Sequence, residues 1–187
     1  MRASVLVASA LLLSVAGVCL VASTVEPPTL RQMVQRADRI FVGQVTAVRS
    51  YWTGASIHTD VTFRSTQTVK GPDGPLVLLT FLGGTVDDVT LEVAGMPQFA
   101  VGDEQVLFAT DRPGQVSPLV GVWHGRVLIS RDPRTRAARV LRHDRTPFDR
   151  AAAVTERAVE ASATMIVPMN LDAFLDQVRQ IASEVRQ

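Results

Sequence analysis

The amino-acid sequence predicts a mainly β protein with antiparallel strands, on the basis of three observations. Between residues 40 and 142, about seven or eight short stretches show strand-like alternation or a short apolar run. Turn-forming glycine and proline clusters separate these stretches, as in Gly71–Pro75. Helical patterns flank this region and do not alternate with the strands. This order favours an antiparallel barrel or sandwich over βαβ units.

The clearest strand pattern covers residues 57–70. Ile57 and Val61 share one face of it, whereas His58 and Asp60 share the other, because residues two apart in a strand point the same way. A polar turn is expected at residues 51–56, between this strand and the one before it. The other expected strands are residues 40–48, 76–82, 86–93, 105–110, 119–123, 125–130 and 137–141.

Three helices are expected around these strands. Thr29 and Gln32 form a capping-box pattern that predicts a short helix over residues 30–38. A weaker, alanine-rich pattern over residues 146–161 predicts a second helix. Asn170 is a suitable N-cap for a C-terminal amphipathic helix. The apolar stripe of that helix consists of Leu171, Phe174, Leu175, Val178, Ile181 and Val185.

Residues 1–22 have the pattern of a secretory signal peptide. Arg2 is the only charged residue among them, a long apolar run follows it, and Ala22 and Ser23 offer a small-residue cleavage site. The alternative is a retained membrane anchor formed by residues 3–22. The sequence therefore predicts an extracellular or periplasmic protein. Its expected parts are the signal peptide (residues 1–22), a β-barrel domain with an N-terminal helix (23–145) and a C-terminal helical extension (146–187).

Composition restricts the chemistry of the remaining 165 residues. They contain 18 basic and 18 acidic residues and no cysteine, since Cys19 lies in the leader. A chain without cysteine cannot form disulfides, zinc–thiolate sites or a cysteine nucleophile. A net charge of zero gives no global electrostatic reason to expect nucleic-acid binding. No cofactor-binding motif is present, and we expect no cofactor.

Two groups of residues are candidates for a binding surface. The first is Trp52 with His58 and Asp60, and the second is the run that contains Trp123, His124 and Arg126. Tryptophan offers a stacking surface, although such residues more often anchor a core. If His58, Asp60 and His124 converge, they form a metal-assisted hydrolase site; otherwise the histidine and aspartate belong to a polar outer face. The loops expected to carry the contact surface are residues 51–57, 83–90 and 111–118.

An arginine-rich stretch, residues 131–145, is the strongest local concentration of charge, with six arginines, one histidine and two aspartates. It falls on a predicted hairpin and can bind a polyanion. The alternative is a solvated sheet edge, where charge prevents pairing with other chains. The residues that would form an anion patch are Arg134, Arg136, Arg139 and Arg142.

Three segments together resemble a group of uncharacterised secreted bacterial proteins. These segments are Leu30–Val45, Thr62–Gly71 and residues 102–108. The layout of that group is similar to the netrin-like module of tissue inhibitors of metalloproteinases, which implies a five-stranded OB-type barrel with flanking helices. Those inhibitors bind the protease zinc through an N-terminal cysteine, whereas the N-terminus expected here is Ser23 or Thr24. The resemblance therefore implies the barrel and not the inhibitory activity.

The leading functional expectation is a secreted or periplasmic, non-enzymatic binding module. Its partner would be an unknown protein or a cell-envelope ligand. We expect no specific nucleic-acid partner, and contact with a membrane only if the leader is retained. The hydrolase and the polyanion-binding protein are the alternatives.

Overall fold

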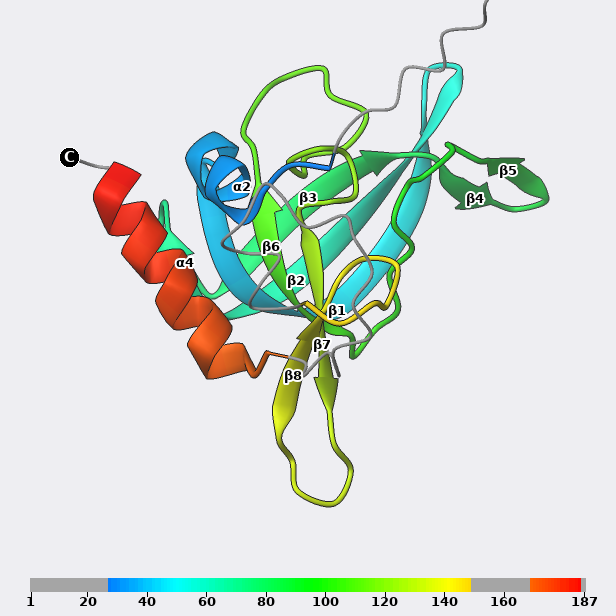
Figure 1. The fold of residues 1–187 in the computed structure, drawn as a ribbon. Coiled ribbons are helices and arrows are strands. Elements are labelled where there is room, and N and C mark those ends of the chain that lie inside the picture. Colours follow the sequence, from blue (N-terminus) through cyan, green and yellow to red (C-terminus); the bar gives the residue numbers. More distant parts are fainter. Residues whose placement is uncertain (1–26, 149–168, 186–187) are drawn as a thin grey trace, which may run out of the picture.

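The fold is that of a mainly β protein with two helices, in a computed structural model that describes residues 27–148 and 169–185. In chain order the elements are α2 (Leu30–Arg36), β1 (Arg39–Thr53), β2 (Ser56–Lys70), β3 (Leu76–Leu82), β4 (Gly84–Val86), β5 (Val89–Leu91), β6 (Glu104–Ala109), β7 (Arg126–Arg131), β8 (Ala138–Leu141) and α4 (Leu171–Val185). Figure 1 shows strongly curved strands with α2 and α4 on one side and the β4–β5 hairpin beyond the sheet.

The main sheet has six antiparallel strands in the order β3-β2-β1-β6-β7-β8. Strands β1, β2 and β3 follow one another as neighbours, and β6 returns to pair with the free side of β1. This is the strand order of a Greek key. The long connection from β3 to β6, residues 83–103, carries the separate two-stranded sheet β4–β5.

Strands β1 and β2 form a long hairpin with a two-residue loop, Gly54 and Ala55. The turn predicted within residues 51–56 is confirmed but is shorter than expected, because both strands continue almost to the tip. Gly54, with φ of 59°, supplies the positive φ that such a tight loop requires. The pairing register of β1 with β2 shifts between Val42 and Gly43, an irregularity of the kind that a β-bulge produces.

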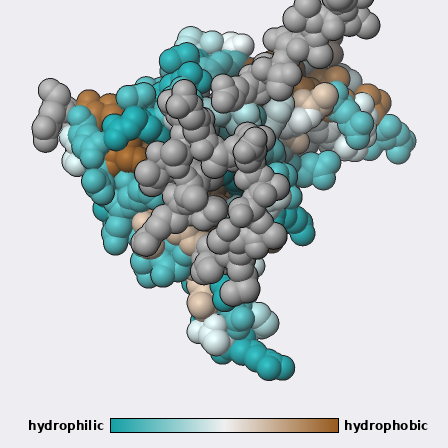
Figure 2. Space-filling model, viewed as in Figure 1, coloured by the Kyte–Doolittle hydropathy of each residue, from teal (hydrophilic) through white to brown (hydrophobic). Residues whose placement is uncertain are grey.

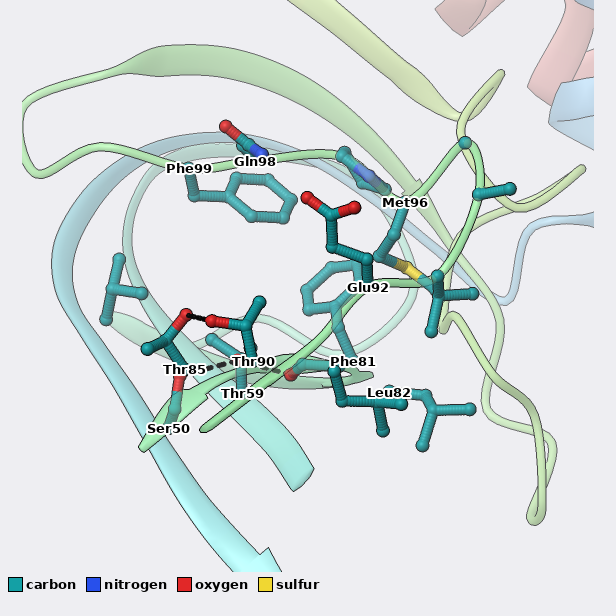
Figure 3. Close-up of a pocket in the computed structure, with 18 residues that line it drawn as sticks. Ser50, Thr59, Phe81, Leu82, Thr85, Thr90, Glu92, Met96, Gln98 and Phe99 are labelled. Atoms are coloured by element: carbon teal, nitrogen blue, oxygen red, sulfur yellow. Dashed lines mark hydrogen bonds between the residues drawn. The ribbon is translucent and has the colours of Figure 1, made fainter. Parts of the chain in front are cut away.

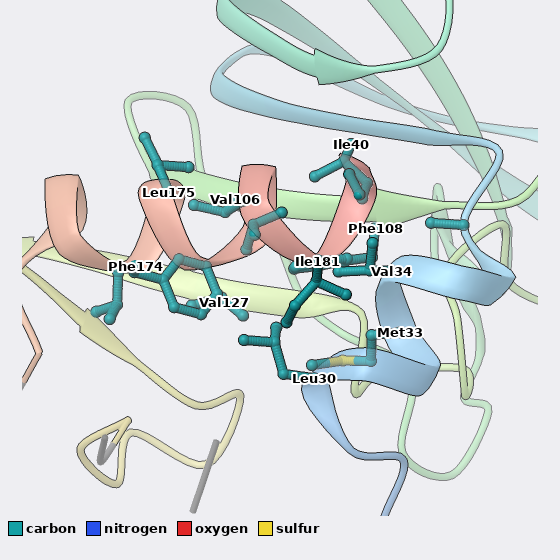
Figure 4. Packing of buried hydrophobic residues seen from close by; sticks show 14 of the residues in the cluster. Leu30, Met33, Val34, Ile40, Val106, Phe108, Val127, Phe174, Leu175 and Ile181 are labelled. Atoms are coloured by element: carbon teal, nitrogen blue, oxygen red, sulfur yellow. The ribbon is translucent and has the colours of Figure 1, made fainter. Parts of the chain in front are cut away.

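One face of the sheet is covered by both helices (Figure 4). The capping box of α2 is confirmed: Thr29 and Gln32 each bond the other's backbone N–H. The Asn170 side chain accepts a hydrogen bond from the N–H of Ala173, which confirms it as a cap of α4. Phe174 is fully buried and lies edge-on to Phe108 and Phe148, with ring centroids 6.4 and 5.0 Å apart. Helix α4 therefore shares one core with α2, β6, β7 and β8.

A second core lies on the opposite face of the sheet. Strand β6 connects the two cores, because Val106 and Phe108 point to the helix side, whereas Leu107 and Ala109 point to the second side. The second core is formed by the inner faces of β1, β2 and β3, and by Leu119. Met96 and Phe99, from the connection between β3 and β6, pack against it. No helix of the described residues covers this face.

Several sequence predictions need correction. Residues 86–93 are not one strand, because Asp87 and Asp88 form a turn between β4 and β5. The described strands form no closed barrel, so the finer OB-type prediction is unconfirmed, although the antiparallel, mainly β architecture is confirmed. Residues 119–123 are not a strand: Leu119 makes a single bridge to Ala109, and turns follow. Backbone bonds from Thr110 to Pro118 and from Val120 to Phe108 hold this segment as a tight loop.

Other predictions lie wholly or partly outside the described residues. The leader, residues 1–22, is among them, and so is most of the weak helix predicted over residues 146–161. Its first residues are described and are not helical, since Pro147 bridges to Leu141. Among the helices that the structure describes, none is long and apolar enough to cross a membrane.

Candidate functional site

A groove of about 870 Å³ lies on the second face of the sheet. One side of it is formed by Val48, Ser50 and Thr59 on β1 and β2, together with Phe81 at the end of β3. The other side is the β4–β5 hairpin and the segment 92–99 that follows it (Figure 3). The groove is therefore built by the long Greek-key connection as it crosses the end of the sheet.

Two consecutive glycines bring the hairpin close to the sheet. Gly83 and Gly84 have φ of 101° and 134°, a region that other residues rarely adopt. A Cβ atom on Gly84 would collide with the hydroxyls of Thr59 and Ser50. The Gly83 N–H bonds to the carbonyl of Ile57 at 2.8 Å. The glycine pair therefore fixes the position of the hairpin against β1 and β2.

A chain of hydrogen bonds runs along the floor of the groove. Thr59 Oγ1 donates to the Gly83 carbonyl at 2.6 Å, and Ser50 Oγ lies 2.8 Å from Thr59 Oγ1. Because Thr59 gives its single proton to Gly83, Ser50 must be the donor to Thr59. Both hydroxyl protons are therefore used in these hydrogen bonds. The two hydroxyl groups can only accept hydrogen bonds from a ligand, through their oxygen lone pairs.

The rest of the lining combines apolar and polar surface in similar amounts and has one ionisable group. Phe81, Met96 and Phe99 are the large apolar residues, and the Phe81 and Phe99 rings lie 4.8 Å apart. Glu92 is exposed and is the only ionisable residue that lines the groove. Figure 3 shows its carboxylate in the same hollow as the hydrogen-bonded pair Thr85 and Thr90.

The prediction that His58 and Asp60 share a face is confirmed, and Tyr51 links them. The Tyr51 ring stacks on His58 at 6.3 Å, and its hydroxyl donates to Asp60 Oδ1 at 3.2 Å. Thr80 Oγ1 donates to the same oxygen at 2.6 Å. This cluster lies on the face of β2 opposite Ile57 and Thr59, so it does not line the groove.

Trp52 is 48% exposed and pairs with Ile57 near the tip of the β1–β2 hairpin. It lies two residues beyond Ser50 on the same strand, so it is on the groove side of the sheet. Trp52 is thus on the opposite face from His58, and the first group predicted as one binding surface is divided between two faces.

The second predicted group contains an aromatic cluster and an arginine. Trp123 stacks on His124 at 5.1 Å, and His143, which the sequence analysis did not select, lies 5.1 Å from His124. Burial lowers the pKa of His143, and the neighbouring His124 lowers it further. A Cβ on Gly95 would come within 2.5 Å of the Trp123 ring. The cluster therefore supports the segment that forms one wall of the groove.

Arg126 lies under the same wall and is largely buried, with 11% of its side chain exposed. Its Nε donates to Gln105 Oε1 at 2.6 Å, and its guanidinium lies 4.7 Å from the centre of the Phe99 ring. Asp103 is 3.6 Å from a terminal nitrogen. Burial lowers the pKa of Arg126, and the Asp103 carboxylate opposes that shift. Arg126 therefore has a structural role, because it packs behind the Phe99 ring.

The alternative hypothesis of a metal centre at His58, Asp60 and His124 required these side chains to converge, and they do not. His58 belongs to the Tyr51 cluster, whereas His124 belongs to the Trp123 cluster. Across residues 27–148 and 169–185, no group of three or more histidine, cysteine, aspartate or glutamate residues is placed to hold a metal ion.

The arginine-rich stretch forms the β7–β8 hairpin, which projects from the body of the molecule with a hydrophilic tip (Figures 1 and 2). Arg134, Arg136 and Arg139 are exposed and make no ion pair within the described part of the chain. Arg142 is half-buried, 4.6 Å from the centre of the Phe148 ring. Three of the four predicted patch residues thus remain available to an anion.

Sequence reasoning found only part of the groove. The predicted loop 83–90 includes Gly83, Gly84, Thr85 and Thr90, which line it. It missed Glu92, Met96 and Phe99, because nothing in a linear pattern shows that the connection folds back over the sheet. The Gly83–Gly84 pair was a usable signal, since paired glycines permit a close approach of backbone to neighbouring strands.

Comparison of the chain with protein-family models, with curated proteins and with solved structures found no match.

Proposed function

We propose that this protein is a non-enzymatic binding module and that the groove beneath the β4–β5 hairpin is its ligand site. The observation that carries the proposal is the groove itself. Its volume of about 870 Å³ lies within the range of roughly 300–1,000 Å³ that is typical of ligand pockets. Its lining combines apolar side chains with a few placed polar groups, as such sites do. A lone exposed carboxylate, Glu92, suits binding better than acid–base chemistry, which usually needs a second tuned group.

The test compares two tryptophan variants of the full chain. Thr90→Trp puts a bulky ring into the groove, and Thr135→Trp puts the same ring on the exposed β7–β8 turn as a matched control. Each protein is immobilised and exposed to extracts of the native cell envelope and medium. Bound molecules are identified by mass spectrometry and then titrated against purified protein.

We expect a ligand that binds the wild type and the Thr135→Trp variant with equal affinity and binds the Thr90→Trp variant at least tenfold more weakly. Equal binding to all three proteins would place the site elsewhere. Reproducible turnover of a substrate by the purified chain, lost in a Thr90→Trp variant, would replace the binding module with an enzyme.

The same proposal includes two further points: the protein is secreted, and its fold is of the OB type. The resemblance to secreted netrin-like proteins supports it, and so does the Greek-key order of β6, β1, β2 and β3, since an OB fold is a partly open Greek-key barrel. Mass spectrometry of the protein recovered from the periplasm or medium tests secretion. An N-terminus at Ser23 or Thr24 is expected, and recovery of the intact chain from the membrane fraction alone would contradict cleavage.

Polyanion binding by the β7–β8 hairpin is a second candidate, favoured by the three exposed arginines without ion pairs. Changing Arg134, Arg136 and Arg139 to glutamine should abolish salt-sensitive retention on heparin. A control with the same charge change replaces Arg36, Arg49 and Arg112, which are exposed elsewhere. Equal loss in both triple variants would show that net charge, not the hairpin, is responsible.

A further inference from the structure

We propose that the groove binds a cationic group on an aliphatic stem: the arginine or lysine side chain of an extended basic segment in a partner protein. The inference rests on the proposed function, because it assigns the ligand chemistry of the same groove. Three independent features of the lining support it: the orientation of its hydrogen bonds, its charge and its apolar surface.

The hydroxyl groups on the floor of the groove can accept hydrogen bonds from a ligand but have almost no free proton to donate. The protons of Ser50 and Thr59 are both used within the chain that ends at the Gly83 carbonyl. In the Thr85–Thr90 pair, one of the two hydroxyl protons is likewise used between them. Oxygen lone pairs therefore outnumber available protons, and a ligand rich in N–H donors satisfies them. Ammonium and guanidinium groups carry three and five N–H donors and no acceptor.

The charges on the outer wall of the groove have a single sign, and the cation behind that wall, Arg126, is paired with Asp103. Residues 83–100, which form this outer wall, contain Asp87, Asp88 and Glu92 and no basic residue. Asp87 and Asp88 form the turn of the β4–β5 hairpin, and Glu92 lines the hollow itself. None of the three makes an ion pair within the described ranges. The wall thus attracts a cation and leaves the Glu92 carboxylate available to pair with it.

The apolar lining fits the stem of such a side chain. Phe81, Met96 and Phe99 form a surface on which methylene groups can pack while the charged head reaches Glu92. The guanidinium of Arg126 already lies 4.7 Å from the centre of the Phe99 ring, so the charged head of the ligand is assigned to Glu92 and only its stem to Phe99. The groove also has more room than one side chain fills, which favours a peptide segment over a single free amine.

The experiment is a calorimetric titration of the full chain with two seven-residue peptides, acetylated and amidated, in which alanine alternates with arginine or with citrulline. Citrulline preserves the shape of arginine and removes its charge. We expect the arginine peptide to bind at least tenfold more tightly than the citrulline peptide. Glu92→Gln should weaken the arginine peptide by about tenfold, as expected for a charge-assisted hydrogen bond. Asp111→Asn, the control, removes an exposed charge outside the groove and should leave the affinity unchanged.

Equal affinity for the two peptides, or wild-type affinity in the Glu92→Gln variant, would overturn the inference. Binding of agmatine as tight as that of the arginine peptide would assign the groove to free amines instead. Sedimentation of the protein alone tests a third source, the β7–β8 hairpin of a second copy. If the protein self-associates and the association disappears when Arg134, Arg136 and Arg139 become glutamine, the groove binds a second copy of this chain. That result would overturn the assignment of the groove to a partner protein.

Failure of this inference can be distinguished from failure of the proposed function. If the arginine peptide does not bind but a native ligand is still lost in Thr90→Trp, the groove is the site and the cation assignment is wrong. If neither ligand depends on Thr90, the groove itself is not the site.

Discussion

The two faces of the main sheet are covered in different ways. On one face, α2 and α4 pack against β6, β7 and β8, and residues such as Val34 and Phe174 are fully buried. On the other face, the cover is a connection, residues 83–103, that carries only a short hairpin and the apolar side chains of Met96 and Phe99. A helix seals a core with a continuous apolar stripe, whereas this connection leaves a groove of about 870 Å³. We therefore expect the helix side to contribute most of the stability, and we propose the other side as the ligand site.

The largest expected effect comes from opening the helix-covered core. Phe174→Ala removes a fully buried ring that contacts Phe108 and Phe148, so we expect a loss of about 3–5 kcal/mol in the free energy of unfolding. The matched change on the other face, Phe99→Ala, removes a half-buried ring and should cost about 1–2 kcal/mol. Denaturant unfolding followed by circular dichroism measures both. Equal losses would end the assignment of stability to the helix side.

A smaller loss of stability is expected at the point where the connection from β3 to β6 leaves the sheet. Gly84→Ala places a Cβ against the hydroxyls of Ser50 and Thr59 in a backbone with φ of 134°. We expect a loss of about 2–3 kcal/mol from strain and crowding together, with weaker ligand binding. Gly102→Ala is the control, since Gly102 also has a positive φ, 97°, but nothing lies within 4 Å of its Cβ position. If the two variants unfold at the same denaturant concentration, the close approach of the hairpin is not important.

The smallest expected effect is a dependence of stability on pH, and it arises beside Trp123, next to the wall of the groove. Burial and the neighbouring His124 hold the pKa of His143 below its ordinary value. Between that lowered pKa and the ordinary value of about 6.5, the unfolded chain binds a proton that the folded chain does not. Stability should therefore fall as the pH decreases from 7 through this window, while the Trp123 fluorescence changes in a Trp52→Phe background.

Urea unfolding at pH 7.5 and 5.5 measures this pH effect. His143→Gln should remove much of the difference between the two midpoints, and His124→Gln should remove part of it, because His124 is the second cause of the shift. An unchanged difference in the His143→Gln variant would assign the acid sensitivity to other groups.

Local patterns predicted most of the elements. The alternation in residues 57–70 predicted β2 almost to the residue, and the capping box at Thr29 predicted the start of α2. The same method failed at residues 119–123, where an apolar stretch folds into a loop because Val120 and Thr110 find backbone partners across a turn. The His58–Asp60 pair was predicted from a period of two, but its partner Tyr51 comes from the neighbouring strand.

The sequence by itself determined most of the strands and helices, which faces are apolar, and that the segment from Gly83 to Ala100 carries acidic residues without a basic one. These are properties of neighbours in the chain, and periodicity and composition express them directly. Only the tertiary structure decided that β6 returns beside β1, that the connection folds over Ser50 and Thr59, and that His124 meets His143 instead of His58. Those contacts depend on strand order and on the curvature of the sheet, which arise from packing between residues far apart in the chain.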